Sequence, residues 1–235
     1  MSKTTLAKLL AKENITVQYG NYQTAWFDIK DRVLGLPMWK DMGKDVHDLF
    51  IGHEVGHALF TPYEGWHDSP EKLEGCPRSY INVVEDARIE RHIKDAYAGL
   101  VGPMARGYKK LFDDEFFGKL DDVNLEEIKL IDKINLKAKI GTHIEVPFND
   151  EEIVFYNRAM TTKTFDDVLE LVRDILAYTK ENTPELLKPQ QEEEQKQEQS
   201  DGEKKKEQEQ NMGHDDMEPQ DNEKQKNKTP HNEDG

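Results

Sequence analysis

The stretch FIGHEVGHALF, residues 50–60, contains the pattern H-E-x-x-H as His53-Glu54-Val55-Gly56-His57. Its apolar residues predict a buried helix over residues 43–60, ended by the Thr61-Pro62 pair. Residues four apart on a helix lie on one face, so both imidazoles can reach one metal ion. Burying two histidines and a glutamate is costly unless these groups are paired or bound to a ligand. The stretch therefore predicts a metal site with His53 and His57 as ligands.

Glu54 follows the first histidine directly, where its carboxylate can take a proton from a metal-bound water. Zinc is the expected ion, one per chain, because catalytic zinc sites use three protein ligands and leave a fourth position for water. The pattern can also arise by chance, but chance matches usually fall on exposed or irregular segments, and here a buried helix is predicted independently. Glu54 is therefore the expected catalytic base.

The third ligand is expected on a second helix, predicted over residues 79–94. Glu85 and Asp86 are adjacent there among apolar residues, so at least one of their carboxylates should point inward. Asp86 has Glu90 one turn later, a carboxylate that could orient a ligating imidazole from behind. Glu85 has the longer side chain and Arg88 three residues later. The choice between Glu85 and Asp86 stays open, and the alternative is an amphipathic helix held by surface ion pairs.

Three further residues could polarise a substrate carbonyl. Tyr63 and His67 lie in a predicted loop over residues 62–77, and Tyr80 lies at the start of the second helix. Cys76 is the only cysteine, so no intrachain disulfide can form and a reducing, cytoplasmic location is expected.

The remaining pattern predicts a mainly helical α+β protein, with a small β element near its N-terminus and the H-E-x-x-H helix packed on the second, ligand-bearing helix. Strand candidates cover residues 15–19, 22–29 and 32–36. We expect the segment 32–36 to offer an edge strand to an extended substrate. The other predicted helices cover residues 4–12, 101–112, 125–137, 150–160 and 164–180.

Charge and composition divide the chain into two parts. Residues 189–235 contain no Val, Ile, Leu, Phe, Tyr, Trp or Cys and carry 15 acidic and 7 basic residues. They predict a disordered acidic, Gln-, Glu- and Lys-rich tail or linker after a folded domain over residues 1–188. The net charge of −16 argues against a nucleic-acid-binding surface, which needs a basic patch. No run of 18 apolar residues is present, so no membrane span is expected.

Three blocks resemble a known family: IGHEVGHALFTP (51–62), RSYINVVEDARIERHIK (78–94) and GPMARGYKKLFDDEFFG (102–118). They are similar to the metallopeptidase-like region of tailed-phage proteins that carry a von Willebrand factor A domain, themselves distantly similar to the T subunit of cobaltochelatase. The resemblance covers roughly residues 20–180.

This resemblance implies a gluzincin-like zincin, with His53 and His57 as zinc ligands, Glu54 as base and the Glu85-Asp86 pair supplying the third ligand. It also implies the host-cell cytoplasm for a phage-encoded chain. Such relatives often continue through an acidic linker into the von Willebrand A domain, and an AAA+ ATPase sometimes acts on them. The chain has no D-x-S-x-S metal-adhesion motif.

The sequence thus predicts a zinc metallopeptidase, a hydrolase in which Glu54 activates a zinc-bound water that attacks a peptide bond of a polypeptide substrate. The alternative is a non-proteolytic interaction module of a larger von Willebrand A or AAA+ assembly, with a structural or vestigial metal site. An intact Glu54 favours the enzyme, because a structural site needs no base. A four-ligand structural zinc site would need another ligand, such as His67 or His92.

Overall fold

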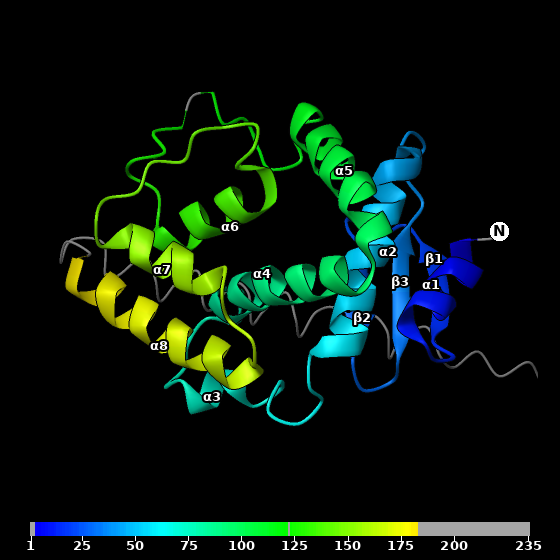
Figure 1. Ribbon diagram of the computed structural model, residues 1–235, viewed down its shortest axis with the longest axis horizontal. Helices are drawn as coiled ribbons and strands as arrows, with labels where there is room; N and C mark the ends of the chain where they lie inside the picture. The colour runs from blue at the N-terminus through cyan, green and yellow to red at the C-terminus, as the bar shows by residue number, and fades with distance from the viewer. Residues whose placement is uncertain (1–2, 122, 183–235) are drawn as a thin grey trace, which may run out of the picture. The chain divides into compact units, whose positions relative to one another are not determined.

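The computed structural model describes residues 3–121 and 123–182 (Figure 1). The predicted acidic tail, residues 189–235, and the last residues of the predicted 1–188 domain lie outside this part. Within it the chain is mainly helical with a small three-stranded sheet near the N-terminus, which confirms that part of the predicted fold class. The helices are α1 (Lys3–Ala11), α2 (Gly43–Phe60), α3 (Ser69–Lys72), α4 (Arg78–Ala96), α5 (Val101–Asp113), α6 (Leu130–Ile140), α7 (Glu152–Ala159) and α8 (Phe165–Asn182), with a 3₁₀ turn at Ala98–Leu100.

The sheet has the strand order β1-β3-β2, so the prediction that residues 32–36 form an edge strand is wrong. β3 (Val33–Pro37) pairs in parallel with β1 (Thr16–Gly20) and antiparallel with β2 (Trp26–Asp28). Four of the five β3 residues are buried, as expected of a strand that has neighbours on both sides. The two edges of this sheet are therefore β1 and β2.

Two predicted elements are shorter in the structure because side chains turn the backbone. The strand expected over 22–29 is reduced to β2, which ends where the Asp28 carboxylate accepts hydrogen bonds from the backbone N–H groups of Lys30 and Asp31, at 2.8 and 2.7 Å. The helix expected from residue 125 begins at Leu130, because Asn124 accepts from the Glu126 N–H at 3.2 Å and forms a turn. The predicted loop 62–77 contains the short helix α3.

Helix α2 packs against α1, α4 and α5 and also contacts β2 and β3 of the sheet (Figure 1). Glycines allow the closest of these approaches. A Cβ on Gly56 would lie 2.8 Å from the Ile89 side chain of α4, and a Cβ on Gly107 of α5 would lie 2.8 Å from the Asp45 carbonyl oxygen of α2. Real Cβ atoms do not approach so closely, so α4 and α5 pack on α2 because these positions lack a side chain.

Two apolar cores include residues of α4. The first joins Ile93 of α4 to residues of α2, such as Ile51 and Val55. The second lies where α4 meets α6, α7 and α8. Fully buried aliphatic residues form its centre, among them Ile81, Val84, Ile134, Val172 and Ile175. With both cores in contact with α4, packing helps to fix the rotation of this helix about its axis. No helix in the described ranges is long and apolar enough to cross a bilayer.

Candidate metal centre

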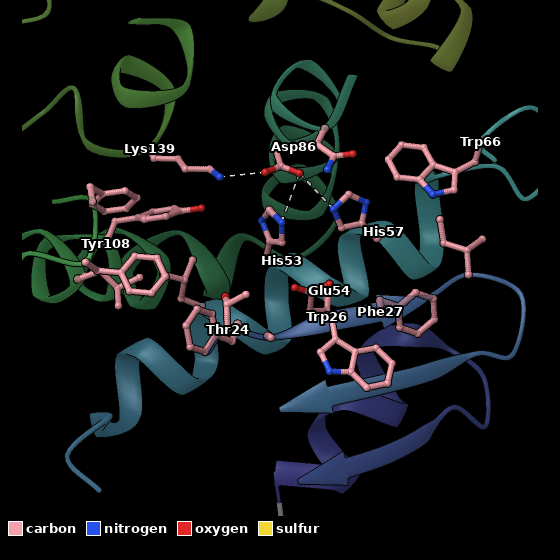
Figure 2. A pocket seen from close by; sticks show the side chains of 18 residues that line it. Thr24, Trp26, Phe27, His53, Glu54, His57, Trp66, Asp86, Tyr108 and Lys139 are labelled. Carbon is pink, nitrogen blue, oxygen red and sulfur yellow. Dashed lines mark hydrogen bonds and ion pairs between the residues drawn. The ribbon is translucent and has the colours of Figure 1, made fainter. Parts of the chain in front are cut away.

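Three potential metal ligands meet where α2 and α4 pack together (Figure 2). Asp86 Oδ1 lies 3.2 Å from His57 Nε2 and 3.5 Å from His53 Nε2, and the three donor atoms lie within 4.8 Å of one another. Ligand atoms bound to tetrahedral zinc at about 2.0–2.1 Å are separated from each other by about 3.3–3.4 Å. Both separations from Asp86 are close to this value, so these three residues could hold a metal ion.

The outer nitrogen of His53 faces a carboxylate. His53 Nδ1 lies 3.0 Å from Glu90 Oε1, and Glu90 also accepts hydrogen bonds from the Tyr108 hydroxyl and, at 2.7 Å, from Lys94. Burial would raise the pKa of Glu90, but the hydrogen bond from His53 and the charges of Lys94, His53 and Lys139 outweigh it and lower the pKa to about 2, so the carboxylate accepts hydrogen bonds. Nδ1 of His53 must therefore carry the hydrogen, and in the neutral ring Nε2 presents a lone pair toward Asp86.

A different chain of hydrogen bonds fixes the same tautomer in His57. The Thr61 hydroxyl donates its only hydrogen to Glu85 Oε1 at 2.6 Å, so its oxygen accepts from His57 Nδ1 at 2.9 Å. Nε2 of a neutral His57 thus also presents a lone pair toward Asp86. This arrangement, in which a second group fixes the ligand's outer nitrogen, is typical of metal-binding histidines.

Glu85 and Asp86, between which the sequence left the third ligand open, have different surroundings. The Glu85 side chain is fully buried and is bound by Arg88 through two hydrogen bonds of 2.6 and 2.8 Å, besides the one from Thr61. Arg88 is buried in turn and donates to the Phe60 carbonyl at 2.8 Å. Glu85 therefore lies behind His57, while Asp86 faces both imidazoles.

In their neutral forms the two imidazoles would thus turn lone pairs, together with a carboxylate oxygen of Asp86, toward one point, where a positive charge is needed. Burial alone would lower the pKa of His53, but the Asp86 and Glu90 carboxylates outweigh it and raise the pKa to about 10. Burial likewise opposes ionisation of Asp86, yet Lys139 and His53 hold its pKa well below the usual range. Protons on the imidazoles or a metal cation can supply this charge, and a divalent cation satisfies all three donors at once.

The carboxylate of Glu54 lies beside this point. It is buried, and burial raises its pKa although the neighbouring histidines oppose the shift. Among the described residues no group donates a hydrogen bond to it, in contrast to Glu85, Asp86 and Glu90. A carboxylate with a raised pKa and no fixed partner is suited to act as a general base.

A cavity of about 370 Å³ opens in front of Glu54 and the three potential ligands. Its wall includes β2, whose Trp26 and Phe27 lie across from the imidazoles in Figure 2. Seven of its 18 lining residues are aromatic: Trp26, Phe27, Phe50, Trp66, Tyr108, Phe116 and Phe117. The cavity thus combines apolar and aromatic side chains with the polar groups of the site, as is common in small-molecule sites.

The structure does not bring the three predicted carbonyl-polarising residues to this cavity. Tyr63 is 53% exposed and packs edge-on against His67 in the loop after α2, where Trp66 lines the cavity instead. Tyr80 lies six residues before Asp86, about 120° away around α4, and is buried in the second core. These residues were predicted from chain order alone, which does not fix the direction of a side chain.

A fourth protein ligand is also lacking among the described residues. The potential metal group contains His53, His57 and Asp86. His92 instead places Nε2 3.0 Å from the Lys163 carbonyl oxygen and packs against Phe60. The three-ligand set leaves a coordination position for water, which distinguishes catalytic from structural zinc sites.

Sequence reasoning missed three residues that hold the site together. Thr61 follows His57 by four residues, a helical spacing that could have indicated it. Tyr108 of α5 and Lys139 of α6 come from helices far away in the sequence, and no local pattern marks them. Lys139 donates to Asp86 Oδ2 at 2.9 Å and also borders the cavity.

No protein-family model, no curated protein and no solved structure matches this chain, so its function is inferred from the residues of the site.

Proposed function

We propose that this chain is a zinc-dependent metallopeptidase with a zincin-like arrangement, in which His53, His57 and Asp86 hold the metal and Glu54 is the general base. The observation that carries the proposal is the convergence of two imidazole Nε2 atoms and a carboxylate oxygen, whose residues are held by Glu90, Thr61 and Lys139, beside a buried glutamate that receives no hydrogen bond from another described residue. A His-His-Asp set differs from the glutamate ligand of a gluzincin-like site, because Glu85 is engaged by Arg88.

The chain's own residues perform the proton transfers of the reaction. When bound, the metal would polarise a water molecule and the substrate carbonyl. Glu54 accepts a proton from that water and delivers it to the leaving amine. Its raised pKa assists the second step, since a carboxyl group with a pKa nearer neutrality is a better proton donor at neutral pH.

The surroundings of the site support an extended polypeptide as the substrate. β2 contributes to the cavity wall and is an edge strand of the described sheet, so no strand of that sheet pairs with its outer side, as strand addition requires. The aromatic wall would accommodate apolar side chains next to the bond that is cleaved. Cooperation with a von Willebrand A protein or an AAA+ ATPase stays a prediction from the family resemblance.

Hydrolysis of an unfolded polypeptide by the zinc-loaded full chain tests the proposal. We expect cleavage of a labelled, unfolded protein and of a mixed peptide library, loss of cleavage after treatment with a zinc chelator, and recovery when zinc is returned. Liquid chromatography with mass spectrometry would identify the cleaved bonds. A chain that holds stoichiometric zinc and cleaves nothing would contradict the peptidase proposal and favour the interaction module.

A further inference from the structure

Each of the three potential ligands forms a hydrogen bond with a residue outside the ligand set, and the carboxylate of Asp86 forms one with Lys139. His53 is fixed through Nδ1 by Glu90 and His57 through Nδ1 by Thr61. Asp86 Oδ2 accepts from Lys139 Nζ at 2.9 Å, while Oδ1 faces the two imidazoles (Figure 2). The last torsion of an aspartate is soft and nearly two-fold, so its own packing does not decide which oxygen points where.

The Lys139 ion pair is largely removed from water. The side chains of Lys139 and Asp86 are 18% and 15% exposed. Burying an unpaired charge costs free energy, so the Lys139 ammonium is held beside the Asp86 carboxylate. Lys139 comes from the last turn of α6, which packs against α4 in the second core. The position of Asp86 Oδ2 is thereby tied to a separate, well-packed helix.

Because of this ion pair, the two carboxylate oxygens of Asp86 have different partners. Oδ2 is paired with Lys139, and Oδ1 is the oxygen that faces the two imidazoles. If both oxygens bound the metal, Asp86 would occupy the coordination position that the attacking water needs. The structure assigns Lys139 as the positioning residue that keeps Asp86 a one-oxygen ligand and the water position open. This inference rests on the proposed metal centre, and it adds a residue that neither the H-E-x-x-H pattern nor the acidic pair on α4 points to.

Lys139→Met tests the inference, because methionine has a similar length but neither charge nor donor. The helix provides a matched control in Lys133, whose buried ammonium pairs with Glu152 at 2.9 and 3.1 Å, away from the cavity. We expect K139M to bind zinc about 10–100-fold more weakly than the wild type in a competition titration, as is usual when a group behind a ligand is lost. K139R should recover most of this affinity, and K133M should lose stability but keep wild-type affinity.

Cobalt substitution gives a readout that a merely structural role of Lys139 would not move. If Asp86 becomes a two-oxygen ligand in K139M, the coordination number rises and the visible absorption of the cobalt-loaded protein weakens. The K133M spectrum should match that of the wild type.

Several outcomes would overturn the assignment. These are zinc affinity of K139M within twofold of the wild type together with an unchanged cobalt spectrum, an equal loss of affinity in K133M, or a K139M chain that is unfolded where K133M is folded. A wild-type chain without metal affinity would instead refute the proposed centre itself, so the two failures are distinguishable.

Discussion

Glu54→Gln is expected to lower the rate of peptide hydrolysis by ~10²–10⁴-fold, the usual contribution of a positioned general base. Glutamine has nearly the same shape but cannot accept the proton. The Glu54 carboxylate receives no hydrogen bond from another described residue, so its replacement should leave zinc content and melting temperature at their wild-type values. Steady-state kinetics on one peptide substrate, together with metal analysis and thermal unfolding of the same sample, measure all three quantities.

Glu71→Gln is a suitable control, because it makes the same chemical change at an exposed position on α3. It should leave hydrolysis unaffected. If E54Q retained most of the wild-type rate while E71Q behaved like the wild type, Glu54 would not be the base. A simultaneous loss of zinc in E54Q would indicate that Glu54 is a ligand or holds one in place.

Glu85→Ala is expected to lower mainly the unfolding free energy, whereas Asp86→Ala is expected to lower mainly the zinc affinity. Loss of Glu85 leaves the buried Arg88 without its ion-pair partner, and breaking such a pair from one side costs about 3–5 kcal/mol of unfolding free energy. Loss of Asp86 removes a proposed ligand and should abolish tight zinc binding. Its effect on the unfolding free energy of the metal-free protein should be smaller, because the Lys139 and Asp86 side chains are 18% and 15% exposed, whereas those of Arg88 and Glu85 are 5% and 0% exposed.

Urea unfolding in the presence of a chelator separates the two effects, because the metal then contributes nothing to stability. Zinc affinity is measured separately, by competition with a chromophoric chelator, at a temperature where both variants are folded. An E85A chain that folds normally but loses zinc, beside a D86A chain that keeps zinc, would reverse the assignment of the two acids.

The sequence was sufficient to predict the helix that carries the H-E-x-x-H pattern. The expected bounds 43–60 coincide with α2, because its apolar residues and the following Thr61-Pro62 pair act locally. The second helix was predicted over 79–94 and observed as Arg78–Ala96 for the same reason. Local signals of this kind do not depend on what the helix packs against.

The sequence could not decide how α4 is rotated about its axis. Both Glu85 and Asp86 lie among apolar neighbours, and which of them faces α2 depends on the Gly56–Ile89 contact and on the burial of Arg88. Lys139 and Tyr108 reach the site only through the packing of α6 and α5. The central position of β3 similarly depends on which strands pair, and pairing is a property of the whole sheet.

The most direct test of the metal centre is the zinc content of the purified full chain and of three histidine variants, measured by mass spectrometry after equilibration with zinc and removal of the excess. We predict about one zinc per chain for the wild type, and a near-complete loss in His53→Ala and His57→Ala, since each removes one of three donors. His92→Ala is the matched control and should keep its zinc, because His92 contacts Lys163 and Phe60 rather than the site. A wild-type chain without zinc, or equal zinc in all four proteins, would contradict the account.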